Sequence, residues 1–221
     1  MKKIFLIITS IFLAHIVFAQ QLPVFKVKGE RTIGLNTAQR VKMQQALALF
    51  EKVMNDTAFQ TAVRTYHFQY DKPDDPNRNL SPEQVAQKLY GGTEWYFPAI
   101  DNTANVYWEL KKKPWLKPKI TIGYGMPQDT VIFTYTWYFD EDDNLPELAG
   151  HIAHEWSHKV GFDHTLEDHP GREETVPYAF GNLVAQFAAK YVPHGPVMMV
   201  AKTYRIPCNS AKPSSAERRY R

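Results

Sequence analysis

The chain has 221 residues, of which 44% are hydrophobic and 14% aromatic. This length suits a single domain with its own core, and the composition excludes a wholly disordered chain. The formal net charge is +3. Apart from residues 111–113 and the last residues, no cluster of lysine and arginine could form a basic face, which argues against a nucleic acid partner.

The first residues, MKKIFLIITSIFLAHIVFAQQ, have the pattern of a secretory signal peptide. Lys2 and Lys3 precede an apolar run that ends at the small residue Ala19. A retained membrane anchor is the alternative, but the run is shorter than the roughly 20 residues that a spanning helix needs. We therefore expect residues 1–19 to be removed, which gives a secreted or periplasmic protein without a membrane span.

The mature chain is expected to be nearly neutral. Two of the 26 basic side chains lie in the signal peptide, which leaves 24 against 23 acidic ones. Cys208 is the one cysteine and cannot form an internal disulfide, so the core, with or without a metal, must hold the fold. Cys208 is either an inert thiol or a point of linkage between chains. We expect residues 206–221 to form a flexible tail and the protein to be a monomer.

The mature chain is expected to begin with an irregular or extended lead-in at residues 20–36, which could also serve as a short pro-segment. A helix is predicted over residues 37–56, because apolar residues recur there at spacings of three to six. A second helical piece is predicted from Thr57, and RTYHFQY (64–70) is expected to form a strand. The buried stripe of the first helix would consist of Val41, Leu47, Phe50, Val53 and Met54.

A polar, proline-broken loop, DKPDDPNRN, is predicted at residues 71–79. The next helix has Ser81 as its expected N-cap and Pro82 at its first helical position. Gly91 and Gly92 are expected to end this helix.

Three strands are predicted next, over residues 104–110, 119–125 and 130–139. The third strand alternates, so its residues divide between two faces. One face would carry Val131, Phe133, Tyr135 and Trp137.

The acidic run at residues 140–143 and Pro146 predict a helix start, because negative charge is favourable at the positive end of a helix dipole. A calcium loop is the alternative, but no glycine or downstream bidentate glutamate completes one. We expect the helix to span about residues 146–160. A loop and a further helix over about residues 177–191 should follow.

The stretch HEWSHKVGFDH (154–164) contains three of the eight histidines of the chain. Residues four apart lie on one face of a helix, so His154 and His158 can bind one cation together. Gly161 suits the left-handed conformation that ends helices, and the chain can then bring His164 back to the same ion. Three protein ligands and an open position are typical of catalytic zinc, so we predict a Zn²⁺ site.

Glu155 follows the first predicted ligand and should lie beside the ion rather than on it. A carboxylate in that place can act as the general base for a zinc-bound water molecule. A purely structural zinc site has no need of such a glutamate, so the pattern favours an enzyme.

The string HExxHxxGxxH resembles the signature of the metzincin clan of zinc endopeptidases. The resemblance implies that the three histidines are the zinc ligands, that Glu155 is the catalytic base, and that Gly161 is the turn. It also implies an α+β, metzincin-like zinc protease domain. Such a domain has a small mixed sheet with a backing helix, an active-site helix and a short C-terminal subdomain, which we assign to residues 37–205.

Metzincins have a methionine turn beneath the zinc, and astacins and serralysins have a tyrosine two residues after that methionine. Here Val176 would replace the methionine, while Tyr178 would keep the place of the tyrosine and reach the metal or the transition state. The alternative for Tyr178 is an aromatic ring packed at a helix start. Met198 or Met199 could instead supply the turn, or both could pack in the core.

The other histidines have weaker patterns. His151 lies one helical turn before the first ligand, but a fourth histidine would close the site, so we expect it to pack or to support a ligand. His169 and His194 lie in loops without a partner at ligand spacing. Asp163 either orients a ligand histidine or faces water.

These features predict a secreted zinc endopeptidase that acts on a protein or peptide substrate. The substrate would pair in extended form with an exposed sheet edge, provided by residues 119–125 or 130–139, as in metzincins. One alternative is a zinc amidase that acts on peptidoglycan or on a side-chain amide. Another is a zinc-stabilised extracellular binding domain without catalysis.

Overall fold

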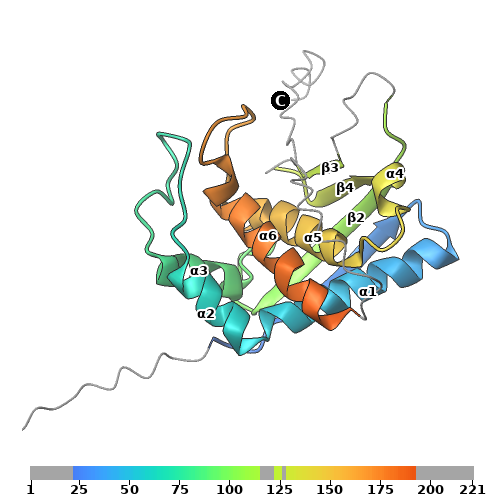
Figure 1. Ribbon diagram of the computed structural model, residues 1–221, viewed down its shortest axis with the longest axis horizontal. Coiled ribbons are helices and arrows are strands. Elements are labelled where there is room, and N and C mark those ends of the chain that lie inside the picture. Colours follow the sequence, from blue (N-terminus) through green and yellow to red (C-terminus); the bar gives the residue numbers. More distant parts are fainter. Residues whose placement is uncertain (1–21, 115–121, 126–127, 193–221) are drawn as a thin grey trace, which may run out of the picture.

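The computed structural model describes residues 22–114, 122–125 and 128–192 (Figure 1). Within these ranges, no helix is both long and apolar enough to cross a membrane. Several predicted features lie outside the described residues: the signal peptide, the tail at residues 206–221, His194, Met198, Met199 and Cys208.

The four strands of the described chain form one open, mixed sheet in the order β1-β2-β4-β3. β1, β2 and β4 run parallel, whereas β3 is antiparallel to β4 and forms an edge. The α+β class and the small mixed sheet are therefore confirmed. The strands are β1 (Lys26–Ile33), β2 (Thr103–Lys111), β3 (Gly123–Gly125) and β4 (Val131–Tyr135).

Helices α5 and α6 lie side by side in front of the sheet (Figure 1). The principal helices are α1 (Thr37–Met54), α2 (Thr57–Thr65), α3 (Pro82–Gly91), α5 (Leu145–Lys159) and α6 (Val176–Ala188). The short helical segments are α4 (Thr136–Phe139), η1 (Arg172–Glu174) and η2 (Ala189–Tyr191). Each of the five predicted helices is confirmed to within a few residues.

An aromatic cluster anchors α5 in the core. The ring of Trp156 lies 5.5 Å from that of Phe25 and 5.9 Å from that of Phe50 on α1, between centroids. Phe50 in turn lies 6.2 Å from Phe180 on α6, and all four rings are fully buried. Because successive residues of a helix point about 100° apart, anchoring Trp156 also fixes the direction of Glu155.

Helix α3 begins and ends at the residues that the sequence predicts. The side chain of Ser81 accepts a hydrogen bond from the backbone N–H of Gln84, and Pro82 occupies the first turn. Gly92 ends the helix with φ at +67°, in the left-handed region where a side chain would be strained.

Of the expectations for the first third of the chain, one is confirmed in part and one is wrong. Residues 20–36, expected to be irregular or extended, contain the extended strand β1, which pairs with β2. The strand predicted over residues 64–70 is absent, because α2 continues to Thr65 and only Gln69 makes an isolated bridge, to Thr175.

Two further details also differ. The strand predicted over residues 130–139 ends at Tyr135, where α4 begins, so Trp137 does not lie on a strand face. Val41, which we assigned to the buried stripe of α1, is 50% exposed because that stripe is centred on Met43, Ala46 and Phe50.

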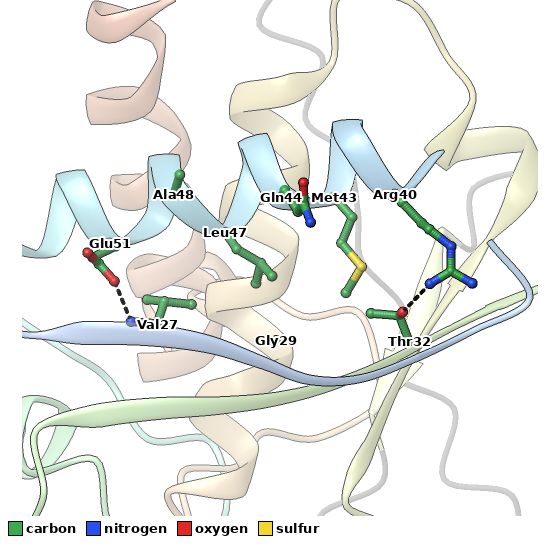
Figure 2. A pocket seen from close by; sticks show the side chains of 9 residues that line it. All are labelled: Val27, Gly29, Thr32, Arg40, Met43, Gln44, Leu47, Ala48 and Glu51. Atoms are coloured by element: carbon green, nitrogen blue, oxygen red, sulfur yellow. Dashed lines mark hydrogen bonds between the residues drawn. The ribbon is translucent and has the colours of Figure 1, made fainter. Parts of the chain in front are cut away.

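A groove of about 440 Å³ lies between β1 and α1. Figure 2 shows the side chains that line it. Val27, Met43 and Leu47 provide its apolar walls, while Arg40 and Glu51 are among its polar residues. The groove lies at the edge of the sheet opposite β3. It contains none of the histidines of the predicted zinc site.

Candidate metal centre

Helix α5, which carries the first half of the motif, is buried on nearly all sides. Pro146 lies in its first turn. Backbone N–H groups there make no hydrogen bond within the helix, so the N–H that proline lacks is not needed. Gly150 allows α6 to approach closely, since a Cβ there would lie 2.6 Å from the carbonyl oxygen of Gly181. Burial of the whole helix makes it a rigid support for its histidines.

The turn after α5 brings the third histidine back to the helix. Gly161 has φ at +94°, as its left-handed role requires, and its N–H donates to the carbonyl of His158 at 3.1 Å. His164 then faces the helix, with its Nε2 3.3 Å from Nε2 of His154. The ligand atoms of His154, His158 and His164 all lie within 4.8 Å of one another.

These three side chains fit a zinc ion. With Zn–N bonds of about 2.0–2.1 Å, two nitrogens of a tetrahedral site lie about 3.3 Å apart, which matches the separation between His154 and His164. The fit therefore rests on the distances between the donor atoms and on their chemical type.

The protonation of two ligands also suits a metal. Nδ1 of His158 lies 2.9 Å from the carbonyl oxygen of Phe162, and Nδ1 of His164 lies 2.7 Å from that of Thr165. A carbonyl only accepts, so each Nδ1 carries the hydrogen and each Nε2 keeps its lone pair for a cation.

Burial keeps the three rings neutral. It lowers the pKa of His154 and of His158 well below the usual value, and it lowers the pKa of His164 to about 4. Metal binding requires neutral imidazole, so these side chains need not lose a proton at pH 7.

Glu155 lies between α5 and the edge strand β3. Its Oε2 would lie 2.7 Å from a Cβ at Gly125, so the absence of a side chain there makes room for the carboxylate. Its Oε1 lies 3.8 Å from Nδ1 of His151, whose Nε2 contacts Oγ1 of Thr134 at 2.9 Å. His151 is thus a buried neighbour of the carboxylate and not one of the converging ligands, as expected.

Tyr178, in the first turn of α6, lies beside the three histidines. Its ring centroid is 4.6 Å from those of His154 and His164. Cζ of Arg172 lies 4.7 Å from the centroid of the same ring. Val176, the candidate replacement for the methionine, is buried at the start of the helix. Tyr178 therefore lies beside the three histidines and is also buried at the start of α6, so both alternatives for this residue stay open.

Asp163 and His169, near the motif, make contacts that the sequence alone did not specify. Oδ1 of Asp163 accepts the N–H of His164 at 2.9 Å and lies 3.7 Å from Nδ1 of His158. His169 has a partner that was not predicted, since its Nε2 lies 2.9 Å from Oδ2 of Asp71. Hydrogen bonds to the carbonyl of Pro170 and to Asp71 raise the pKa of His169.

Sequence reasoning missed two supports of the site. Glu94 accepts hydrogen bonds from Nε1 of Trp156 at 2.8 Å and from the backbone N–H of Asn105 at 2.7 Å, which ties α5 to β2. Asp71 and Lys72, in a loop predicted only to be polar, contact the segment that carries His164. No signal in the sequence links residues so far apart.

Comparisons of the chain with protein-family models, with curated proteins and with solved structures find no match. The functional assignment therefore rests on the motif and on the geometry of the site.

Proposed function

We propose that this protein is a secreted zinc-dependent endopeptidase of the metzincin type. The observation that carries the proposal is the convergence of His154, His158 and His164, with Glu155 beside the first of them. A merely structural site would not need this buried carboxylate next to its ligands.

A zinc ion held by the three histidines would polarise the scissile carbonyl and lower the pKa of a water molecule toward about 7. The carboxylate of Glu155 then takes the proton from the attacking water and passes it to the leaving amine. The burial of Glu155 supports this role, because charges act more strongly where bulk water is excluded.

The edge strand β3 suits an extended substrate. It pairs with β4 through residues 123–125, and its other edge has no partner strand among the described residues. β4 itself cannot be that edge, because it pairs with β2 on one side and with β3 on the other. A substrate strand beside β3 would lie next to Glu155, since Gly125 packs against that carboxylate.

The first test is metal removal. The purified protein should cleave extended peptides, lose at least about 90% of this activity in a zinc chelator, and regain it with added Zn²⁺. Peptides of six or more residues should be cleaved faster than a blocked dipeptide, because only they reach along β3. The assay follows cleavage of a peptide library by mass spectrometry.

The outcomes separate the alternatives. Full activity in the chelator would contradict the proposal. Cleavage of peptidoglycan fragments but not of peptides would instead indicate an amidase. Zinc binding without cleavage of either substrate would indicate a zinc-stabilised binding domain.

Tyr178→Phe should lower kcat by about 10²–10³-fold, if its hydroxyl donates to the oxyanion of the tetrahedral intermediate. KM and zinc affinity should stay nearly constant, because the phenyl ring keeps the contacts with His154 and His164. Steady-state kinetics and a zinc titration measure both. A change in kcat below about threefold would leave Tyr178 with only a packing role.

A further inference from the structure

The loop between α2 and α3 runs beside the segment that carries the third histidine (Figure 1). The two segments are joined by backbone and side-chain contacts. The backbone N–H of Gln69 donates to the carbonyl of Glu174 at 2.9 Å, and Asn77 donates through Nδ2 to the carbonyl of Gly161 at 2.8 Å. Both ends of the segment that carries His164, at Gly161 and at Glu174, are therefore attached to this loop.

Asp71 makes the central contact. Its Oδ2 accepts hydrogen bonds from the backbone N–H and from the hydroxyl of Thr165, both at 2.9 Å. The same oxygen lies 2.9 Å from Nε2 of His169, and the side chain is only 7% exposed. Hydrogen bonds to a charged group are stronger than those between neutral groups, so this carboxylate holds Thr165 firmly.

Thr165 passes this constraint on to His164. Its carbonyl accepts the Nδ1 hydrogen of His164 at 2.7 Å, which turns Nε2 toward the other histidines. The backbone of Thr165 is thus fixed by Asp71 on its N–H side and orients the third ligand on its carbonyl side.

Lys72 acts on the residue that precedes His164. Its Nζ pairs with Oδ2 of Asp163, while Oδ1 of Asp163 accepts the N–H of His164. This ion pair is about one-third exposed on both sides, so its contribution is smaller than that of Asp71.

We propose that Asp71 and Lys72 form a clamp that positions His164 for metal binding, with Asp71 as its principal residue. Two consecutive residues of one loop hold the two neighbours of the ligand, one on each side. The inference rests on the metal site of the proposed function, but not on its peptidase activity. Both residues act on His164 through its neighbours Thr165 and Asp163, so they are positioning residues.

The clamp should have a measurable effect on the affinity for zinc. Residues that orient a metal ligand typically change metal affinity by about 10–100-fold when they are removed. Asp71→Ala should therefore raise the Kd for zinc by about 10–100-fold. Lys72→Met should raise it by no more than about fivefold, because an ion pair that is about one-third exposed contributes little.

The experiment is a zinc titration of the purified protein against a chromophoric chelator at pH 7.5, with melting curves of each metal-free variant. Asp74→Ala is the matched control, since Asp74 is an exposed aspartate of the same loop. Cobalt-loaded samples add a readout that a merely structural role would not change, because the visible bands report the ligand set. Loss of His164 from the metal should change these bands in Asp71→Ala but not in the control.

A second pair of variants covers the case in which Asp71→Ala does not fold. Thr165→Val removes the hydroxyl that donates to Asp71 but keeps the backbone contact, so it should raise the Kd several-fold. Thr165→Ser keeps the hydroxyl and should restore the affinity to within about twofold.

A Kd for folded Asp71→Ala within about twofold of the control, with unchanged cobalt bands, would overturn the clamp alone. Weakened zinc binding in a protein without peptidase activity would support the clamp and contradict the proposed function. A wild-type protein that binds no zinc would overturn both.

Discussion

Glu155→Gln is expected to lower kcat for peptide cleavage by about 10²–10⁴-fold, the usual contribution of a general acid–base group. Glutamine keeps the shape of the side chain beside Gly125, but it cannot take a proton from the attacking water. Zinc affinity should stay within a few-fold of the wild-type value, because Glu155 is not among the converging ligands. Kinetics on a peptide substrate and a zinc titration measure the two effects separately.

Glu147→Gln is the matched control for this variant. Glu147 lies on the same helix, in its first turn, eight residues before Glu155. Its replacement should leave kcat unchanged. Activity of Glu155→Gln close to that of Glu147→Gln would remove Glu155 from the reaction and with it the proposed proton transfer.

The metal-free protein should lose at least about 4 kcal/mol of unfolding free energy between pH 7 and pH 5, about 2 kcal/mol from each of His151 and His164. In the folded state burial lowers the pKa of His151 to about 3 and that of His164 to about 4, against about 6.5 in the unfolded chain. The unfolded state therefore binds protons first as the pH falls. The stabilisation by these neutral rings is fully present above about pH 6.5. By pH 5, preferential protonation of each histidine in the unfolded state lowers the unfolding free energy by about 2 kcal/mol.

His154 and His158 act in the same direction, since burial lowers their pKa values too. His169, whose pKa is raised, has the opposite sign, but it is exposed enough for solvent to weaken its effect. Urea unfolding at pH 7, 6 and 5 measures the change, with His67→Gln as a control because His67 is exposed. A flat profile between pH 7 and 5 would show that the rings are not buried in neutral form.

Features that depend on neighbouring residues could be read from the sequence. Ser81 and Gly92 mark the ends of α3 because capping involves only the first and last turns of a helix. The spacing of His154 and His158 places both rings on one side of α5 for the same reason.

Features that depend on distant pairing could not be read in this way. β1 is a largely exposed edge strand without apolar alternation, and its pairing with β2 joins residues more than 70 positions apart. The segment at residues 64–70 alternates over only seven positions, a length at which helix and strand patterns overlap. In the structure α2 continues to Thr65, so the start of this segment is helical and not a strand.

For the candidate site, the sequence by itself determined the three converging histidines, the adjacent carboxylate and the glycine turn, because all of them lie within eleven residues. The tertiary structure alone decided what holds them in place. β3 meets Glu155 at Gly125, Glu94 fixes Trp156, and the clamp fixes His164. These contacts join segments from 30 to 94 residues apart, and only packing of the whole domain can bring such segments together.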